Sequence, residues 1–114
     1  MFRSIQREEI LQHLQTKTPM ILVEALPEKY YRDGHLPGAI NLPHDQVRQQ
    51  AAEVLPNKNA FIVVYCANTP CQNSAIAART LDSLGYTQVA EYVAGKQDWV
   101  EAGLSLDKSV EKAA

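Results

Sequence analysis

Two uninterrupted apolar stretches constrain the fold of this chain more than any other feature of its sequence. They occupy residues 61–65 and 20–23, and both are rich in aliphatic side chains. A strand with one face in water alternates apolar and polar residues, whereas an unbroken apolar run is typical of a strand buried on both faces. Residues with helical periodicity separate the two runs. The sequence therefore predicts a mostly parallel sheet with helices on both faces.

The stretch at residues 61–65 delivers a cysteine, Cys66, to the start of a loop. Residues 75–84 then repeat apolar side chains at helical spacing, and Gly85 suits the left-handed end of a helix. The first turn of a helix leaves backbone N–H groups without partners and carries partial positive charge. A thiol at that position is shifted toward the thiolate, and an anion attached to it is held by the amides. We therefore predict that Cys66 is a nucleophile.

Length and charge exclude several classes of protein. A chain of 114 residues forms one domain that needs no metal or disulfide to fold. A net charge of −2 without a basic cluster argues against a nucleic-acid partner. No apolar run is long enough to span a membrane and no export signal is evident, so we expect a reducing, cytoplasmic location. Two cysteines in that setting predict thiols rather than a disulfide framework. The oligomeric state stays open.

The rest of the chain alternates helical and extended patterns. We expect helices capped by Ser4 and at residues 28–32, 44–55 and 97–102, and further strands at residues 39–41 and 89–93. Together they form a single domain over residues 1–106, followed by a frayed tail at residues 107–114. Glu24 closes the strand at residues 20–23, so it should share the carboxyl edge of the sheet with Cys66.

Residues 34–41 read G-H-L-P-G-A-I-N, which resembles the G-H-I-P-G-A-x-N turn of the rhodanese-like domain. The strand end at Cys66, the helix from Ser74, Gly85 before a strand, and Gly95 ahead of Trp99 follow in the order of that family. The resemblance covers roughly residues 4–106. It implies an α/β three-layer sandwich, with a five-stranded, mostly parallel sheet, helices on both faces, and Cys66 as the active cysteine.

The resemblance also implies a chemistry, that of a sulfurtransferase or sulfur carrier. A thiolate takes sulfane sulfur from thiosulfate or a persulfide, holds it as a Cys66 persulfide, and passes it to a thiol or cyanide acceptor. The donor is a small molecule or a persulfide-bearing protein, and neither a cofactor nor a metal is expected. Backbone amides around the loop would hold the sulfur. These are the amides of Ala67, Asn68, Thr69, Pro70, Cys71, Gln72, Asn73 and Ser74.

The loop departs from the pattern of many active members. It contains no arginine or lysine, and seven residues separate Cys66 from Ser74. The family's usual Asp-Val-Arg after the second strand is replaced by Glu24, Ala25 and Leu26. Thiosulfate, a dianion, would therefore meet backbone dipoles without a cationic side chain. We predict weak thiosulfate turnover and a better fit for persulfide donors, which carry less charge.

Two further side chains have alternative interpretations. Cys71 is either a resolving thiol that forms a disulfide with Cys66 or a small side chain that packs the loop, and an exchange of roles with Cys66 is a third alternative. A metal site at this pair would need further ligands, and no histidine lies nearby in the sequence. His35 is either a supporting acid–base group or a structural histidine that hydrogen-bonds the turn backbone, and we favour the structural role.

Two other functions compete with sulfur transfer. The missing loop cations suit a non-catalytic binding or redox-sensing module that uses Cys66 and Cys71 as a switch. A cysteine phosphatase or arsenate reductase would need an arginine to bind the oxyanion. Gln72 stands six residues after Cys66, and Arg79 lies well inside the predicted helix, so we disfavour this class.

Overall fold

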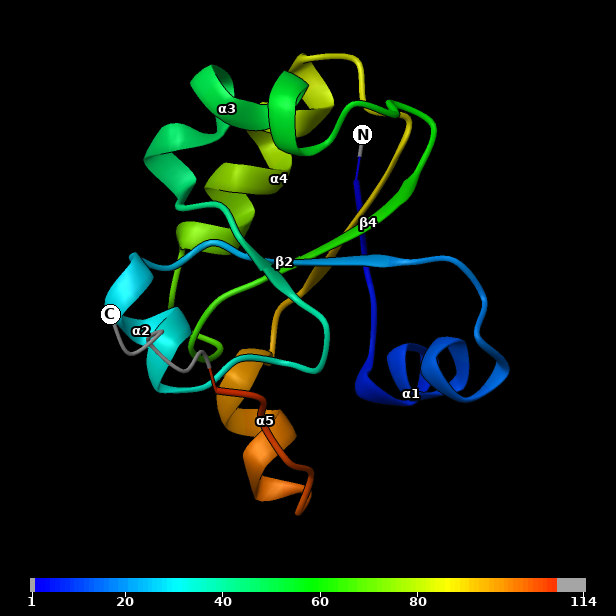
Figure 1. Cartoon of the computed structure of the whole chain (residues 1–114), viewed down its shortest axis with the longest axis vertical. Coiled ribbons are helices and arrows are strands. Elements are labelled where there is room, and N and C mark those ends of the chain that lie inside the picture. The colour runs from blue at the N-terminus through cyan, green and yellow to red at the C-terminus, as the bar shows by residue number, and fades with distance from the viewer. Residues whose placement is uncertain (1, 109–114) are drawn as a thin grey trace, which may run out of the picture.

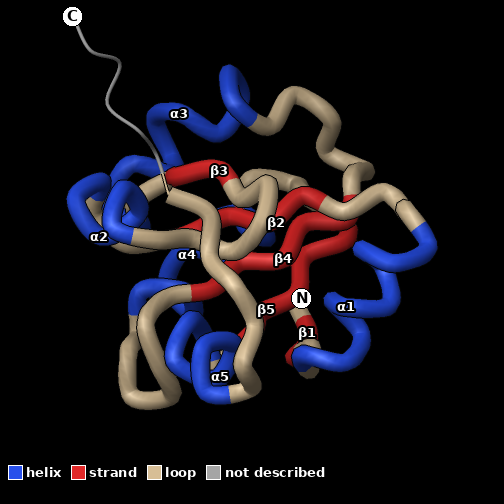
Figure 2. Tube along the Cα trace, turned by 60° about the horizontal axis from the view of Figure 1, so that its bottom comes forward, coloured by secondary structure: helices blue, strands red, loops and turns tan. Residues whose placement is uncertain are grey.

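A central parallel sheet organises the structure, a computed structural model that describes residues 2–108. Its strands are β1 (Arg3–Ser4), β2 (Ile21–Glu24), β3 (Ile40–Asn41), β4 (Phe61–Tyr65) and β5 (Gln88–Tyr92). They lie in the order β1-β5-β4-β2-β3, which Figure 2 shows from one edge to the other, and every neighbouring pair is parallel. The predicted five-stranded α/β architecture is confirmed.

Helices cover both faces of this sheet. They are α1 (Arg7–Thr16), α2 (Glu28–Asp33), the 3₁₀ turn η1 (His44–Gln46), α3 (Val47–Val54), α4 (Asn73–Ser83) and α5 (Gly95–Glu101). Figure 1 shows α3 and α4 on one side of the sheet and α1 and α5 on the other. None of the helices in the described part of the chain is long and apolar enough to cross a bilayer.

Strand β4 is buried on both faces, as its apolar run predicts. Ile62 and Val64 belong to the core beneath α3 and α4, whereas Val63 and Tyr65 belong to the core beneath α1 and α5. All four side chains are fully buried. Burial of each aliphatic side chain contributes about 1.5–3 kcal/mol, so β4 anchors both halves of the core.

The strand register places polar side chains at the carboxyl edge of the sheet. Glu24 at the end of β2 pairs with Tyr65 at the end of β4, which in turn pairs with Tyr92 of β5. One residue earlier, Val64 of β4 pairs with Glu91 of β5. Since Cys66 follows Tyr65 directly, these side chains surround the point where the cysteine leaves the sheet.

Several predicted boundaries were wrong. Ser4 caps no helix, because it pairs with β5 as part of β1, and α1 instead begins after Gln6. The helix predicted from residue 44 does begin there, although its first three residues form the 3₁₀ turn η1 and it becomes α-helical at Val47.

The predicted end of the ordered domain also falls too early. Asp107 forms a β-bridge with His35, where the amide of each residue donates to the carbonyl of the other, so the tail predicted to fray begins with a paired residue. Residues 109–114 of that tail lie outside the described residues.

Candidate active site

Cys66 lies where β4 ends, and its side chain is 1% exposed. Helix α4 begins at Asn73, two residues before the predicted start at residue 75. The loop proper is therefore residues 67–72, and the amides of Asn73 and Ser74 belong to the first turn of α4. This agrees with the predicted position of the cysteine, beside a helix N-terminus.

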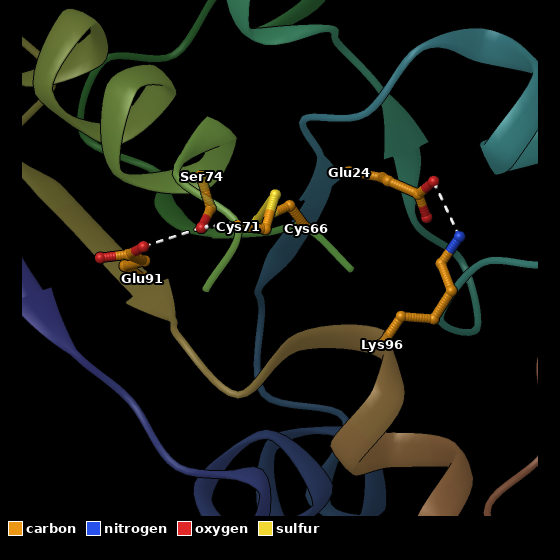
Figure 3. Close-up of a disulfide and its surroundings, with 6 residues drawn as sticks. All are labelled: Glu24, Cys66, Cys71, Ser74, Glu91 and Lys96. Carbon is orange, nitrogen blue, oxygen red and sulfur yellow. Dashed lines mark hydrogen bonds and ion pairs between the residues drawn. A yellow bond between two sulfur atoms is a disulfide. The ribbon is translucent and has the colours of Figure 1, made fainter. Parts of the chain in front are cut away.

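Cys66 and Cys71 are joined by a disulfide, drawn in Figure 3. Their Cα atoms are 6.4 Å apart, within the range that a disulfide spans. The Cys71 amide donates to the Asn68 carbonyl at 3.1 Å, which closes a turn inside the loop. The expectation of two thiols from composition is not met in this oxidised form. The pairing brings Cys71 into contact with Cys66, and a resolving role for Cys71 stays a prediction.

The predicted set of loop amides needs a correction at two positions. Pro70 has no N–H group, because its nitrogen is part of the ring, so it cannot donate to bound sulfur. The Cys71 amide is already engaged with Asn68. The remaining amides, those of Ala67, Asn68, Thr69, Gln72, Asn73 and Ser74, stay a prediction.

The first turn of α5 holds the other side of the cysteine loop. The Lys96 amide donates to the Cys66 carbonyl at 2.9 Å, and the Gln97 amide donates to the Ala67 carbonyl at 2.8 Å. Gly95 makes this approach feasible, because it has a φ of +68° and a Cβ there would lie 2.6 Å from the Cys66 carbonyl oxygen. Gly95 is one of the residues on which the family resemblance rests. The structure explains why a glycine is needed at this position.

A buried hydroxyl links Cys66 to a carboxylate. The Ser74 hydroxyl lies 3.3 Å from the Cys66 sulfur and donates to the Glu91 carboxylate at 2.7 Å. Ser74 is fully buried and Glu91 is 8% exposed. A hydroxyl has one proton, so Ser74 donates either to the carboxylate or to the sulfur. In the reduced protein, the serine can therefore stabilise a Cys66 thiolate by turning its proton toward it.

This arrangement predicts opposite effects for two substitutions. Ser74→Ala removes a hydrogen-bond donor from the thiolate, so the midpoint of the pH profile for alkylation of Cys66 should rise. Glu91→Gln removes a nearby negative charge, so that midpoint should fall. We expect shifts of about 0.5–1 pH unit in each direction, measured by alkylation of Cys71→Ser protein with iodoacetamide. Shifts of the same sign in both variants would contradict this account.

A buried ion pair lies on the opposite side of the disulfide. Figure 3 shows Ser74 and Glu91 on one side and Glu24 and Lys96 on the other. The Lys96 ammonium lies 3.0 Å from the Glu24 carboxylate, which is fully buried, and 3.1 Å from the Tyr30 carbonyl. Breaking such a pair costs about 3–5 kcal/mol because one charge is left buried alone.

Tyr65 completes this group. Its hydroxyl donates to Glu24 at 2.7 Å and accepts the Leu36 amide at 3.0 Å. Burial raises the pKa of the Tyr65 phenol far above its usual range, and the Glu24 carboxylate raises it further, so the phenol stays a donor. Glu24 thus stands at the predicted edge as a structural anchor that ties α5 and the turn at Leu36 to the sheet.

His35 does not join this group of side chains. Its Nδ1 lies 2.8 Å from the Tyr31 carbonyl, and its ring stacks on that of Tyr31 at 3.8 Å between centroids. These contacts are of the kind expected for the structural role favoured from the sequence, which stays a prediction. Among the described residues, no three His, Cys, Asp or Glu side chains gather in a way that would hold a metal ion.

Sequence reasoning missed the roles of three side chains: Glu91, Lys96 and the hydroxyl of Ser74. A signal existed for Glu91, which is the single acidic residue within the strand predicted at residues 89–93. A charged side chain in a buried strand needs a hydrogen-bond or ion-pair partner, so the sequence indicated that Glu91 would have one. No comparable signal existed for Lys96, because its partner Glu24 lies 72 residues away.

Comparison with known proteins agrees with this architecture. The family model described as "Rhodanese-like domain" matches residues 6–102. The solved rhodanese-like domain of an Anabaena protein has a TM-score of 0.83 at 23% identity, covering 100% of this chain and 85% of that one. A rhodanese from Escherichia coli, solved with anions, has a TM-score of 0.66 at 29% identity, covering 79% of this chain and 99% of that one.

One curated protein with a similar sequence is named for an enzymatic activity. The thiosulfate sulfurtransferase PspE of Escherichia coli is 37% identical over 73 residues, which cover 64% of this chain and 66% of that protein. An HTH-type transcriptional regulator of Mycobacterium tuberculosis is 31% identical over 105 residues, which cover 92% of this chain and 45% of the regulator. The chain thus spans about half to two thirds of these relatives. Because the family model matches residues 6–102, nearly the whole described chain, the chain belongs to the rhodanese-like domain family.

Proposed function

We propose that the protein is a sulfurtransferase or sulfur carrier that takes up sulfane sulfur as a persulfide on Cys66 and passes it to a thiol or cyanide. The observation that carries this proposal is the position of Cys66 at the carboxyl end of β4, beside the first turn of α4. The helix dipole and the Ser74 hydroxyl both favour the thiolate there. The names of relatives that include a sulfurtransferase and a putative sulfur carrier support the same chemistry.

The charges around the loop favour a persulfide donor over thiosulfate. Residues 67–73 contain no cation, and the nearby Lys96 ammonium is already paired with Glu24. A pocket of about 270 Å³ beside Thr69 and Pro70 is also lined by Asp98, which is ion-paired with Arg7, and by Glu101. Thiosulfate carries two negative charges and would meet no cationic side chain within the loop itself. A thiol persulfide, bearing at most one charge at its sulfur, faces less repulsion.

The test uses Cys71→Ser protein, in which Cys66 stands alone. After reduction, we expect a thiol persulfide to add one sulfur atom, seen by intact mass, and cyanide to remove it as thiocyanate. Uptake from thiosulfate should be slower by at least tenfold, equivalent to about 1.4 kcal/mol in the barrier. Absence of any adduct from either donor would reject sulfur transfer.

A loop cation provides a matched control for the donor preference. Gln72 is exposed at the end of the loop, so Gln72→Arg should accelerate uptake from thiosulfate and leave uptake from the persulfide nearly unchanged. The uncharged variant Gln72→Leu should change neither rate. Equal acceleration by both variants would show that charge does not set the preference.

The disulfide favours a second candidate, a redox-sensing module. In that case Cys66 and Cys71 would be a switch that closes on oxidation without carrying sulfur. Reduced wild type would then lose two hydrogen atoms on mild oxidation, while Cys71→Ser would take up sulfur from neither donor. A cytoplasmic location, which we also propose, would supply the thiols that keep the pair reduced.

A further inference from the structure

We propose that Cys71 attacks the Cys66 persulfide, releases the outer sulfur as hydrosulfide and leaves the Cys66–Cys71 disulfide, so that the protein acts as a dithiol-dependent persulfide reductase. This inference rests on the proposed uptake of sulfur at Cys66. It adds a second fate for the sulfur, which leaves as hydrosulfide when Cys71 reacts before an external acceptor does.

The geometry places the two sulfur atoms for this step. Cys71 Sγ is bonded to Cys66 Sγ, and in a persulfide Cys66 Sγ is the inner sulfur, attached to Cβ. The turn from Asn68 to Cys71 keeps the Cys71 backbone in place, with its Cα 6.4 Å from that of Cys66. The product of the proposed attack is therefore the bond that the structure contains.

Proximity favours Cys71 over acceptors from solution. Cys66 is 1% exposed, so an external nucleophile reaches its inner sulfur poorly. Cys71 is half-buried in the same loop, five residues along the chain. An attack within one short loop has an effective concentration far above that of free thiols, provided that the reacting atoms are held near each other.

The step balances in atoms and electrons. The Cys71 thiolate attacks the inner sulfur, the bond between inner and outer sulfur breaks, and its electron pair leaves on the outer sulfur: Cys71–S⁻ + Cys66–S–SH → Cys66–S–S–Cys71 + HS⁻. The sulfane sulfur is reduced by two electrons to hydrosulfide, and the two cysteine sulfurs are oxidised to the disulfide.

Turnover requires a reductant, which we assign to the dithiol class. One thiolate of the dithiol attacks the disulfide to give a mixed disulfide, and its second thiol displaces the protein, so that both cysteines return as thiols. Cys71 is the more accessible of the two cysteines for this attack, because it is half-buried whereas Cys66 is 1% exposed.

The test is a single turnover without added reductant. Reduced wild type is mixed with one equivalent of a low-molecular-weight thiol persulfide, and hydrosulfide and intact mass are measured together. We expect wild type to release one hydrosulfide per protein and to lose two hydrogen atoms. Cys71→Ser should instead keep one added sulfur and release at least about tenfold less hydrosulfide. The variant Glu53→Gln, at an exposed position of α3 outside the loop, should behave like wild type.

The outcomes separate this inference from the proposed function. If Cys71→Ser carries a persulfide but wild type also retains it without releasing hydrosulfide, sulfur uptake stands and the resolving role of Cys71 is rejected. If the added sulfur in wild type maps to Cys71, the thiol relays sulfur outward, and the inference is equally rejected. If neither protein takes up sulfur, the proposed function fails, and the inference with it.

Discussion

Cys66→Ser is expected to reduce sulfur uptake from thiosulfate and from persulfides to background. A serine hydroxyl at this position is not ionised near neutral pH and cannot replace a thiolate as the attacking group. The measurement is the intact mass of reduced protein after exposure to each donor, with Cys71→Ser as the matched control that retains Cys66. The two variants remove the same disulfide, so its loss cannot account for a difference between them.

Folding of the Cys66→Ser variant has to be established in the same experiment. Cys66 is buried and behaves as a small apolar side chain, so its replacement by serine should cost about 1–2 kcal/mol in the free energy of unfolding. Urea denaturation against Cys71→Ser gives this value. A persulfide that forms on Cys71 in the Cys66→Ser variant would contradict the assignment and exchange the roles of the two cysteines.

Gly95→Ala should destabilise the protein by about 3 kcal/mol and slow sulfur uptake by roughly 100-fold. Two penalties add at this position. Gly95 has a φ of +68°, which an alanine adopts poorly, and the new Cβ would lie 2.6 Å from the Cys66 carbonyl oxygen and 3.0 Å from backbone atoms of Ala67 and Asn68. Because these contacts are with backbone, relief of the clash requires the cysteine loop to move away from α5.

Gly103→Ala isolates the first of these penalties. Gly103 has a φ of +82°, but a Cβ there would have no neighbour within 4 Å. It should therefore cost only the about 1–2 kcal/mol of a left-handed alanine and leave sulfur uptake unchanged. Urea denaturation of the reduced variants and the rate of adduct formation provide the comparison. Equal losses in the two variants would show that the approach of α5 to the loop does not matter.

Much of the fold could be predicted because its signals are local. The burial of β2 and β4 can be inferred from four or five consecutive apolar residues in each strand. Helical periodicity located the ends of α4 to within two residues. The boundaries that failed depend on partners elsewhere. Ser4 has the side chain of a helix cap, yet pairing with β5 places it in a strand, because backbone hydrogen bonds across the sheet outweigh a local preference.

Some features of the candidate site could likewise be predicted from local sequence, and others could not. The sequence by itself determined that Cys66 ends a buried strand, that Glu24 ends its neighbour, and that Cys71 shares the loop with Cys66, since all three follow from periodicity and spacing along the chain. It also showed that the loop contains no cation. The sequence did not show whether the side chain of Cys71 would point toward Cys66.

Only the tertiary structure decided which side chains surround the cysteine. The order of strands places β5 next to β4, which brings Glu91 to Ser74. The first turn of α5 brings Lys96 to Glu24, which lies 72 residues away in the sequence. A pattern of apolar residues specifies which face of an element is buried, but not which element lies beside it. The burial of Glu24 and Glu91, and their pairing, therefore follow from the packing of the whole sheet.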